Sequence, residues 1–433
     1  MGQPIRKKIQ EVHADLIKEP PFRTLLVDGN SLLYKCFADT KVNSYGVIVG
    51  PITRFLTQIR LQLEKGEFEY VYVFFDIEGS GLLRYQYYSP YKANRDKNYE
   101  KIMESLNLSN YGKAVEDRLN KWKKKYAKGT TSVSKKFDPE LYRNIINAYK
   151  VGKIKEAKIL KDYPKDIAKK IIRVAEDELL KENFDRCRDI LCEMFNELYI
   201  RWNVDEITEG DDMIAYYCLN KKENEKIIII SGDMDLSQLI ADDIAIYNLN
   251  IKEYITPKNF KSHFGYYYEN TLLKKIFCGD VSDNISNIKG LSETGLMEMM
   301  PEIKTRKVTV DEVKERAKEL IGERISQKKK PYVLHQNIVN GISNKEYDGD
   351  FYEINDKIIN LHHPLLSEKA KESMDAMMYA PMDPEGRSVK NLYKIILDQN
   401  IQDLQSDTQF SGFFRPFKKL EEKELKRFNE SKK

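Results

Sequence analysis

Short apolar runs that end at a carboxylate recur along the first part of the chain. The run Thr24–Val27 stops at Asp28 and is followed by helical patterning. The helical pattern Ile52–Glu64 then leads to a second apolar run, Tyr70–Phe75, which ends at Asp76. Strands that alternate with helices in this way predict a mostly parallel sheet covered by helices on both faces.

A third unit of the same kind follows after a long interval. We expect Cys187–Arg201 to be helical and Glu209–Asn220 to form another helix. The apolar run Lys226–Ile230 is expected to be a buried strand, with Asp233 shortly after its end. The carboxyl edge of an open parallel sheet is where ligands bind, so the acids that follow these strands are candidates for one site.

The charge of the chain is concentrated rather than uniform. The whole chain of 433 residues has a formal net charge of only +4. The segment from Lys113 to Lys136, however, contains nine basic residues and only two acidic ones, and it also contains Trp122 and Tyr126. This composition suits a nucleic-acid backbone with aromatic faces for bases, and a solvated helix face is an equally good interpretation of the segment alone.

Composition also limits the location and the kind of metal site. No apolar run approaches the ~20 residues that a membrane span requires, so we expect a soluble, cytoplasmic protein with no membrane contact. The five cysteines are scattered without a C-x-x-C pair, which fits a reducing compartment. None of the five histidines has zinc-site spacing with them, so any metal should have oxygen ligands.

Carboxylates gathered in one cleft would repel each other and would need cations. Any one of these acids alone is better explained as a turn former or a helix cap. The joint pattern favours divalent ions, since Mg²⁺ takes oxygen ligands and two such ions ~4 Å apart support phosphodiester hydrolysis. The acids with this placement are Asp28, Asp76, Glu209, Asp211, Asp212, Asp233, Asp235, Asp280 and Asp283.

Six short motifs in a fixed order resemble the 5′ nuclease family, which includes flap endonucleases, 5′→3′ exonucleases and the bacteriophage ribonuclease H type. They span roughly residues 23–300. The motifs are Leu26-Val27-Asp28-Gly29-Asn30, Phe74-Phe75-Asp76, Tyr91-Lys92-Ala93-Asn94-Arg95, Glu209-Gly210-Asp211-Asp212, Ser231-Gly232-Asp233-Met234-Asp235-Leu236 and Gly279-Asp280-Val281-Ser282-Asp283-Asn284-Ile285.

The resemblance implies two metal clusters. One would comprise Asp28, Asp76, Glu209, Asp211 and Asp212, and the other Asp233, Asp235, Asp280 and Asp283, some of them acting through bound water. Both would hold Mg²⁺, with Mn²⁺ as a substitute.

The resemblance also implies cations and stacking groups around the metals. Lys92 would stabilise charge on the phosphate at the base of an arch, and Tyr91 would stack on a terminal base. Lys35 stands where phage relatives often carry an arginine aimed at the scissile phosphate. Arg84 matches a family arginine that contacts phosphate, and Arg95 belongs to the same DNA-binding block as Lys92.

The run Gly279–Gly295 resembles the helix-three-turn-helix of this family, which binds duplex DNA. Lys289, Gly290 and Ser292 are the expected contacts. Ser292 replaces the usual second glycine of the turn. Duplex contact is therefore the stronger expectation for this turn, and K⁺ coordination is the weaker one. Near the C-terminus, packing onto the core is the favoured role for Phe413–Phe417.

The implied fold is an α/β, PIN-like 5′ nuclease fold with a mostly parallel sheet, a helical arch and a helix-three-turn-helix lobe. Four parts are expected: an N-terminal extension (1–22), the nuclease domain (23–255, with an arch or insertion at 96–181), the DNA-binding lobe (256–345) and a C-terminal helical region with a polar tail from about residue 421 (346–433).

The implied activity is metal-dependent hydrolysis near 5′ ends, as a 5′→3′ exonuclease and flap endonuclease. Its substrates would be 5′ flaps, nicked or branched DNA duplexes and RNA–DNA hybrids, in primer removal during phage replication. We expect a monomer in the host cytoplasm, with single-stranded-DNA-binding protein or other replication proteins as partners.

Three alternatives are open. A catalytically silent DNA-binding protein would lack some of the acids, and a toxin-like PIN ribonuclease would be much shorter. A small-molecule phosphatase would need D-x-D at the first strand, where this chain has Asp28-Gly29-Asn30.

Overall fold

The structure is a computed structural model and describes residues 22–39, 41–77, 79–92, 145, 147–162 and 165–433. One sheet has the strand order β3-β2-β1-β4-β5-β6, and every neighbouring pair is parallel except β5 and β6. The mostly parallel α/β architecture is therefore confirmed. The strands are β1 (Arg23–Asp28), β2 (Tyr70–Asp76), β3 (Arg201–Asp205), β4 (Lys226–Ser231), β5 (Ile244–Asn248) and β6 (Glu253–Ile255).

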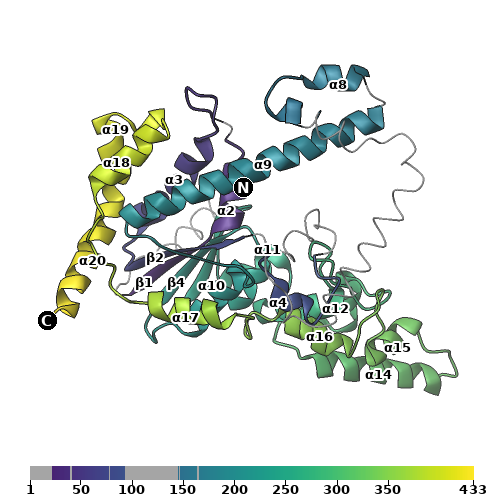
Figure 1. Cartoon of the computed structure of the whole chain (residues 1–433). Coiled ribbons are helices and arrows are strands. Elements are labelled where there is room, and N and C mark those ends of the chain that lie inside the picture. The colour runs from purple at the N-terminus through teal and green to yellow at the C-terminus, as the bar shows by residue number, and fades with distance from the viewer. Residues whose placement is uncertain (1–21, 40, 78, 93–144, 146, 163–164) are drawn as a thin grey trace, which may run out of the picture.

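Helices surround the sheet and continue to the C-terminus (Figure 1). Before the last strand they are α2 (Gly29–Cys36), α3 (Gly50–Lys65), α4 (Leu82–Tyr85), α8 (Glu156–Asp162), α9 (Lys165–Glu197) and α10 (Gly210–Leu219). After it they are α11 (Pro257–Phe264), α12 (Thr271–Cys278), α13 (Glu293–Met299), α14 (Val310–Ser326), α15 (Val333–Asn340), α16 (Phe351–Ile359), α17 (Glu368–Met377), α18 (Val389–Asp398), α19 (Asp407–Phe414) and α20 (Lys418–Ser431). None of these described helices combines the length and the apolar composition needed to cross a bilayer.

Side chains alternate along the strands and so build two hydrophobic cores. On one face, Val27, Val73 and Ile230 pack with α2, α3 and α9. On the other face, Leu26 and Tyr72 pack with α10 and with the helices that follow β6. Figure 1 shows α3 and α9 on one side of the sheet and α10 and α17 on the other. Because both faces are covered, these strands read as continuous apolar runs in the sequence.

The strand register brings the expected acids to one edge. Val27 pairs with Ile230, so Asp28 at the end of β1 lies beside Ser231 at the end of β4. Asp28 is also paired in register with Phe74, which places Asp76 two residues further along β2. The sheet itself therefore positions the first carboxylates of the predicted site.

Three strands are absent from our sequence expectations. The helix predicted over Cys187–Arg201 ends at Glu197, and Arg201 begins β3 at the edge of the sheet. The short strands β5 and β6 extend the other edge. The helical pattern predicted after Pro257 is confirmed.

The last three helices, α18, α19 and α20, pack on the side of the sheet that carries α3 and α9. Phe413, Phe414 and Phe417 are buried in this core, which confirms the predicted packing role. The polar segment from about residue 421 belongs to helix α20, which continues to Ser431. Glu424, at 1% exposure, anchors it to Arg201 of β3. The predicted extension at 1–22, most of the 96–181 arch and the basic segment 113–136 lie outside the described residues, apart from Phe22.

Candidate active site

The carboxyl ends of the parallel strands open into one cavity of about 520 Å³. Acids from β1, β2 and the segments around α10, β4 and α12 meet there. Eight of the nine acids predicted as metal ligands line the cavity: Asp28, Asp76, Glu209, Asp211, Asp233, Asp235, Asp280 and Asp283. The structure therefore brings these acids together around a common hollow.

Three of them, Asp28, Asp76 and Asp211, form what we call the first acidic group. Asp28 caps α2 by accepting a hydrogen bond from the Ser31 backbone N–H at 2.9 Å. The Ser231 hydroxyl donates to its other oxygen at 2.6 Å. The backbone N–H of Gly210 donates to Asp76 at 2.5 Å. These bonds fix the carboxylates of Asp28 and Asp76 while leaving them in contact with the cavity.

Crowding in the first acidic group disfavours full ionisation. Burial, with further contributions from Asp76 and Asp233, raises the pKa of Asp28 to about 7, although its hydrogen bonds from Ser231 and Ser31 act in the opposite direction. Burial and the neighbouring carboxylates also raise the pKa of Asp211. Carboxylates in this situation either hold protons or bind cations.

Asp235, Asp280 and Asp283 form the second acidic group. Each offers one carboxylate oxygen, and these oxygens lie within 4.8 Å of one another. Asp233 links the two groups, since it accepts the backbone N–H of Asp235 at 2.8 Å. The spacing is that of a site with oxygen ligands for a divalent ion.

A lysine that we did not predict lies in the second acidic group. Lys275 of α12 forms ion pairs with both Asp235 and Asp280. Burial opposes ionisation of Asp280, but Lys275 outweighs it and lowers the pKa of this carboxyl to about 2. At Asp235 burial has the larger effect and raises the pKa to about 7, although Lys275 opposes the shift. The only sequence signal was a Lys-Lys pair in an apolar helix just before Asp280.

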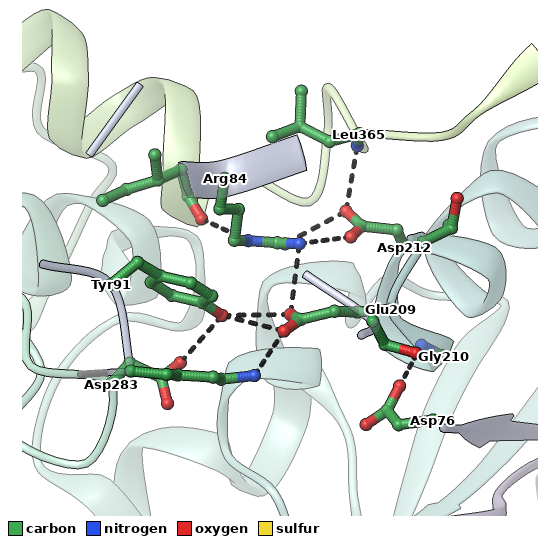
Figure 2. A network of polar contacts seen from close by, with 12 residues as sticks. Asp76, Arg84, Tyr91, Glu209, Gly210, Asp212, Asp283 and Leu365 are labelled. Atoms are coloured by element: carbon green, nitrogen blue, oxygen red, sulfur yellow. Dashed lines mark hydrogen bonds and ion pairs between the residues drawn. The ribbon is translucent and has the colours of Figure 1, made fainter. Parts of the chain in front are cut away.

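Glu209, the N-cap residue of α10, sits at the centre of a network of cations and hydroxyls, as Figure 2 shows. Lys92 forms an ion pair with one oxygen, and Arg84 Nη1 lies 3.1 Å from the other. The Tyr91 hydroxyl donates to the same carboxylate at 3.0 Å. Burial disfavours the charge, but Lys92 and Arg84 outweigh it and lower the pKa of Glu209 to about 2.

Arg84 and Tyr91 differ from our expectations. Arg84, expected to contact a phosphate, is 5% exposed, and its guanidinium binds Asp212, Glu209 and the backbone oxygen of Ile358. Tyr91, expected to stack on a base, lines the cavity but is only 2% exposed. Both side chains are committed to protein partners, so their geometry suits positioning of the acids.

Asp212 is the predicted ligand that does not line the cavity. It is fully buried, and its carboxylate accepts hydrogen bonds from Arg84 and from the Leu365 backbone N–H at 3.0 Å. Its ion pair with the guanidinium makes it the anchor of Arg84 (Figure 2).

Lys92 and Lys35 both line the cavity as predicted. Lys92 has a left-handed backbone, with φ 49°, and its N–H donates to the Asp283 backbone oxygen at 2.8 Å. Its side chain is 19% exposed. Lys35 extends from α2 and is exposed. One lysine is therefore fixed beside the acids, and the other is open to solvent.

Two glycines beside the site allow close approach of the backbone. Gly81 has φ +89°, and a Cβ there would collide with the carboxylate of Glu209. Gly279, just before Asp280, has φ +69°, and a Cβ would lie 2.6 Å from the backbone oxygen of Ile285. Side chains at these positions would displace the acids, because L residues rarely adopt such φ values.

The expected duplex-binding residues lie beyond the cavity. Lys289, Gly290 and Ser292 are exposed in the turn between α12 and α13. Gly290 has φ +84°, and Ser292 caps α13 by accepting the Gly295 N–H at 3.1 Å. Arg95 lies outside the described residues.

Comparison with known families decides the affiliation of the chain. Residues 23–115 and 138–265 match the family described as 5′-3′ exonuclease, N-terminal resolvase-like domain. The chain belongs to the 5′-3′ exonuclease family. The match contains the first acidic group, Glu209 and Asp235, whereas Asp280 and Asp283 lie beyond it. In this family member the second acidic group is therefore completed by a segment outside the matched domain.

The curated relatives of this 5′-3′ exonuclease family member align over short segments. The 5′-3′ exonuclease of Mycoplasmopsis pulmonis is 34% identical over 98 residues, which is 22% of this chain and 33% of that protein. The 5′-3′ exonuclease of Buchnera aphidicola is 34% identical over 82 residues, or 18% of this chain and 28% of that protein. The chain thus spans about a third or less of the length of these relatives.

Solved structures with a similar arrangement include T5 5′-exonuclease with bound zinc, at 14% identity and a TM-score of 0.49, covering 87% of this chain and 98% of that one. The catalytic core of Rad2 in complex with DNA is 12% identical with a TM-score of 0.44, covering 94% of this chain and 98% of that one.

Proposed function

We propose that the protein is a divalent-metal-dependent 5′ nuclease. It hydrolyses phosphodiester bonds near the 5′ ends of DNA and of RNA paired to DNA, and it cuts 5′ flaps. The setting we propose is removal of RNA primers and flaps during phage DNA replication in a bacterial cytoplasm. The observation that carries the proposal is the convergence of eight carboxylates and three cavity-lining lysines, Lys35, Lys92 and Lys275, at the carboxyl edge of the sheet.

The two acidic groups fit divalent cations bound by oxygen. Opposite ligands of Mg²⁺ lie about 4.2 Å apart, and the 4.8 Å spread of the second acidic group needs only a small contraction to reach this value. In the first acidic group the pKa values of Asp28 and Asp211 are raised, and a bound cation would lower them again by stabilising the ionised carboxylates. Divalent ions bound there would activate a water molecule and stabilise the leaving oxygen. Mg²⁺ is our choice, with Mn²⁺ as a substitute.

The residues of the chain have separate tasks in this proposal. Lys92, held by Glu209 and by its bond to the Asp283 backbone, would donate hydrogen bonds to a non-bridging phosphate oxygen as negative charge develops there. Lys35, exposed at the cavity mouth, would bind the phosphate backbone before reaction. Arg84 and Tyr91 would hold Glu209 in place, since they contact it directly.

Duplex binding is assigned to the turn that carries Lys289, Gly290 and Ser292. Its exposure and the positive φ of Gly290 support a close approach to a phosphate backbone. K⁺ is a candidate ion for this turn, and other replication proteins are candidate partners of the monomer.

The test is a cleavage assay with Mg²⁺ on 5′-labelled flap, nicked, single-stranded and RNA–DNA substrates. Wild-type protein should cut the flap and the hybrid, and Asp211→Ala should abolish cutting. Asp243→Asn is the matched control, because Asp243 pairs with Lys221 beside the start of β5, at the opposite edge of the sheet.

Cutting by Asp211→Ala at the wild-type rate would refute the metal assignment. Tight structure-selective binding without any cutting by the wild-type protein would instead indicate a catalytically silent DNA-binding protein.

A further inference from the structure

Lys275 occupies the position where a cation would enter the second acidic group. Its Nζ lies 2.6 Å from Asp280 Oδ2 and is also paired with Asp235 Oδ1. These are two of the three oxygen donors that cluster within 4.8 Å. The lysine side chain is only 13% exposed, so its ammonium is enclosed with the carboxylates rather than extended into solvent.

The position of this ammonium is reinforced by the loop that follows α12. Asp280 accepts hydrogen bonds on its other oxygen from the backbone N–H of Ser282, at 2.8 Å, and of Asp283, at 3.3 Å. The oxygen that faces Lys275 therefore has a fixed direction. Lys275 itself extends from an ordered helix, α12, and its four-carbon stem can swing without a change of the backbone.

The first acidic group differs in this respect. Within the described ranges, no lysine or arginine forms an ion pair with Asp28, Asp76 or Asp211. Burial raises the pKa of Asp76 and Lys92 opposes the shift through its charge, but the ion pair of Lys92 in the structure is with Glu209 and not with a member of this group. The two groups therefore differ as sites for an incoming divalent ion. The second acidic group already contains the Lys275 ammonium, whereas no lysine or arginine of the described residues is paired with the first.

We propose that Lys275 is a built-in competitor of the second divalent ion, so that the two acidic groups load in order. An ion enters the first acidic group directly. An ion enters the second acidic group only when the Lys275 ammonium leaves Asp235 and Asp280, since both cations need the same oxygens. This inference rests on the proposed metal dependence and assigns Lys275 a positioning role, because it acts through metal ligands rather than on the substrate.

The direction of the effect follows from Coulomb's law. A unit positive charge within a few ångströms of the incoming ion opposes binding, and in a partly enclosed site this repulsion exceeds its value in water. Removal of the charge should therefore tighten the second site by roughly tenfold or more. The first site should change little.

The experiment is a Mn²⁺ titration of the DNA-free protein, in which electron paramagnetic resonance measures free Mn²⁺. Wild-type protein should bind one ion tightly and a second more weakly. Lys275→Met should tighten the second step by roughly tenfold or more, and Lys275→Arg, which keeps the charge, should leave it weak. Lys274→Met is the matched control, because the neighbouring Lys274 pairs with Glu293 at 3.1 Å and not with either acidic group.

Second-site binding in folded Lys275→Met that is unchanged or weaker, with the first step intact, would overturn this inference and leave the proposed function standing. Absence of any Mn²⁺ binding by the wild-type protein would overturn both. Circular dichroism checks the fold of each variant, and Lys275→Gln, which keeps a polar end without charge, gives the same test if the methionine variant does not fold.

Discussion

The guanidinium of Arg84 makes a bidentate ion pair with the carboxylate of Asp212, with Nη1 2.5 Å from Oδ2 and Nη2 3.1 Å from Oδ1. Both side chains are almost completely buried, at 6% and 1% exposure. The same Nη1 also reaches Glu209 at 3.1 Å. Arg84 thus joins the buried Asp212 to Glu209, an acid of the cavity, so the position of Glu209 depends on this buried ion pair.

Arg84→Met should destabilise the protein by about 3–5 kcal/mol, because it leaves buried carboxylates without their partner. The double variant Arg84→Met/Asp212→Asn should be less destabilised than Arg84→Met alone, since the amide removes one unpaired charge and still accepts the Leu365 N–H. Urea unfolding followed by circular dichroism measures both values. Equal stabilities of the two variants would contradict the coupling.

Lys92→Met should lower kcat about 10²–10³-fold with little change in KM, because its ammonium is fixed beside the acids where charge develops on the phosphate. Lys35→Met should mainly raise KM, since the exposed lysine lies at the cavity mouth. Steady-state kinetics on a 5′-flap substrate separates the two effects. A pure KM effect of Lys92→Met would show that this lysine binds substrate without acting on the transition state.

The strand-end acids and the strongly apolar strands were predictable because each signal is local. Asp28 and Asp76 directly end buried runs, and the strand order then brings them together. The strand β3 was missed because it begins with Arg201, whose burial requires Glu424 from the far end of the chain.

The roles of the buried cations depended on long-range packing in the same way. From the sequence, Arg84 and Tyr91 were interpreted as DNA-binding residues. In the fold they are enclosed by the backbone at Ile358 and by the carboxylates of Glu209 and Asp212. The role of Lys275 was not predicted from the sequence for a similar reason. Its partner Asp235 belongs to a different segment, and only the fold makes them neighbours.

Divalent ions should release protons when they bind. The pKa values of Asp28 and Asp235 are raised to about 7, mainly by burial, so both carboxyls are partly protonated at pH 7 in the metal-free protein. A bound cation favours their ionised forms, and the protons leave. Calorimetric titration with Mg²⁺ in two buffers of different ionisation enthalpy should detect net release at pH 7 and much less at pH 9. Equal release at both values would show that other groups titrate.

The ion pairs around Glu424 should make the stability of the C-terminal helices sensitive to acid. Arg201 lies 2.5 Å and Arg427 2.8 Å from the same Glu424 oxygen. Burial would raise the pKa of Glu424, but the hydrogen bonds and charges of Arg201 and Arg427 outweigh it and lower the pKa. A lowered folded-state pKa gives stability that is complete above the unfolded value of about 4.3 and is lost as the pH falls through the folded value.

Glu424→Gln should therefore cost about 3 kcal/mol of unfolding free energy at pH 7, because it leaves Arg201 buried without its counter-ion. The difference from the wild type should begin to shrink as the pH falls below about 4.3, because the unfolded wild-type chain takes up a proton there, whereas the folded carboxylate, whose pKa is lowered, does so only at lower pH. Urea unfolding at several pH values measures the difference, with Glu430→Gln, an exposed position on the same helix, as the control. A difference that stays constant down to pH 3 would mean that Glu424 stabilises α20 through shape and hydrogen bonding rather than through its charge.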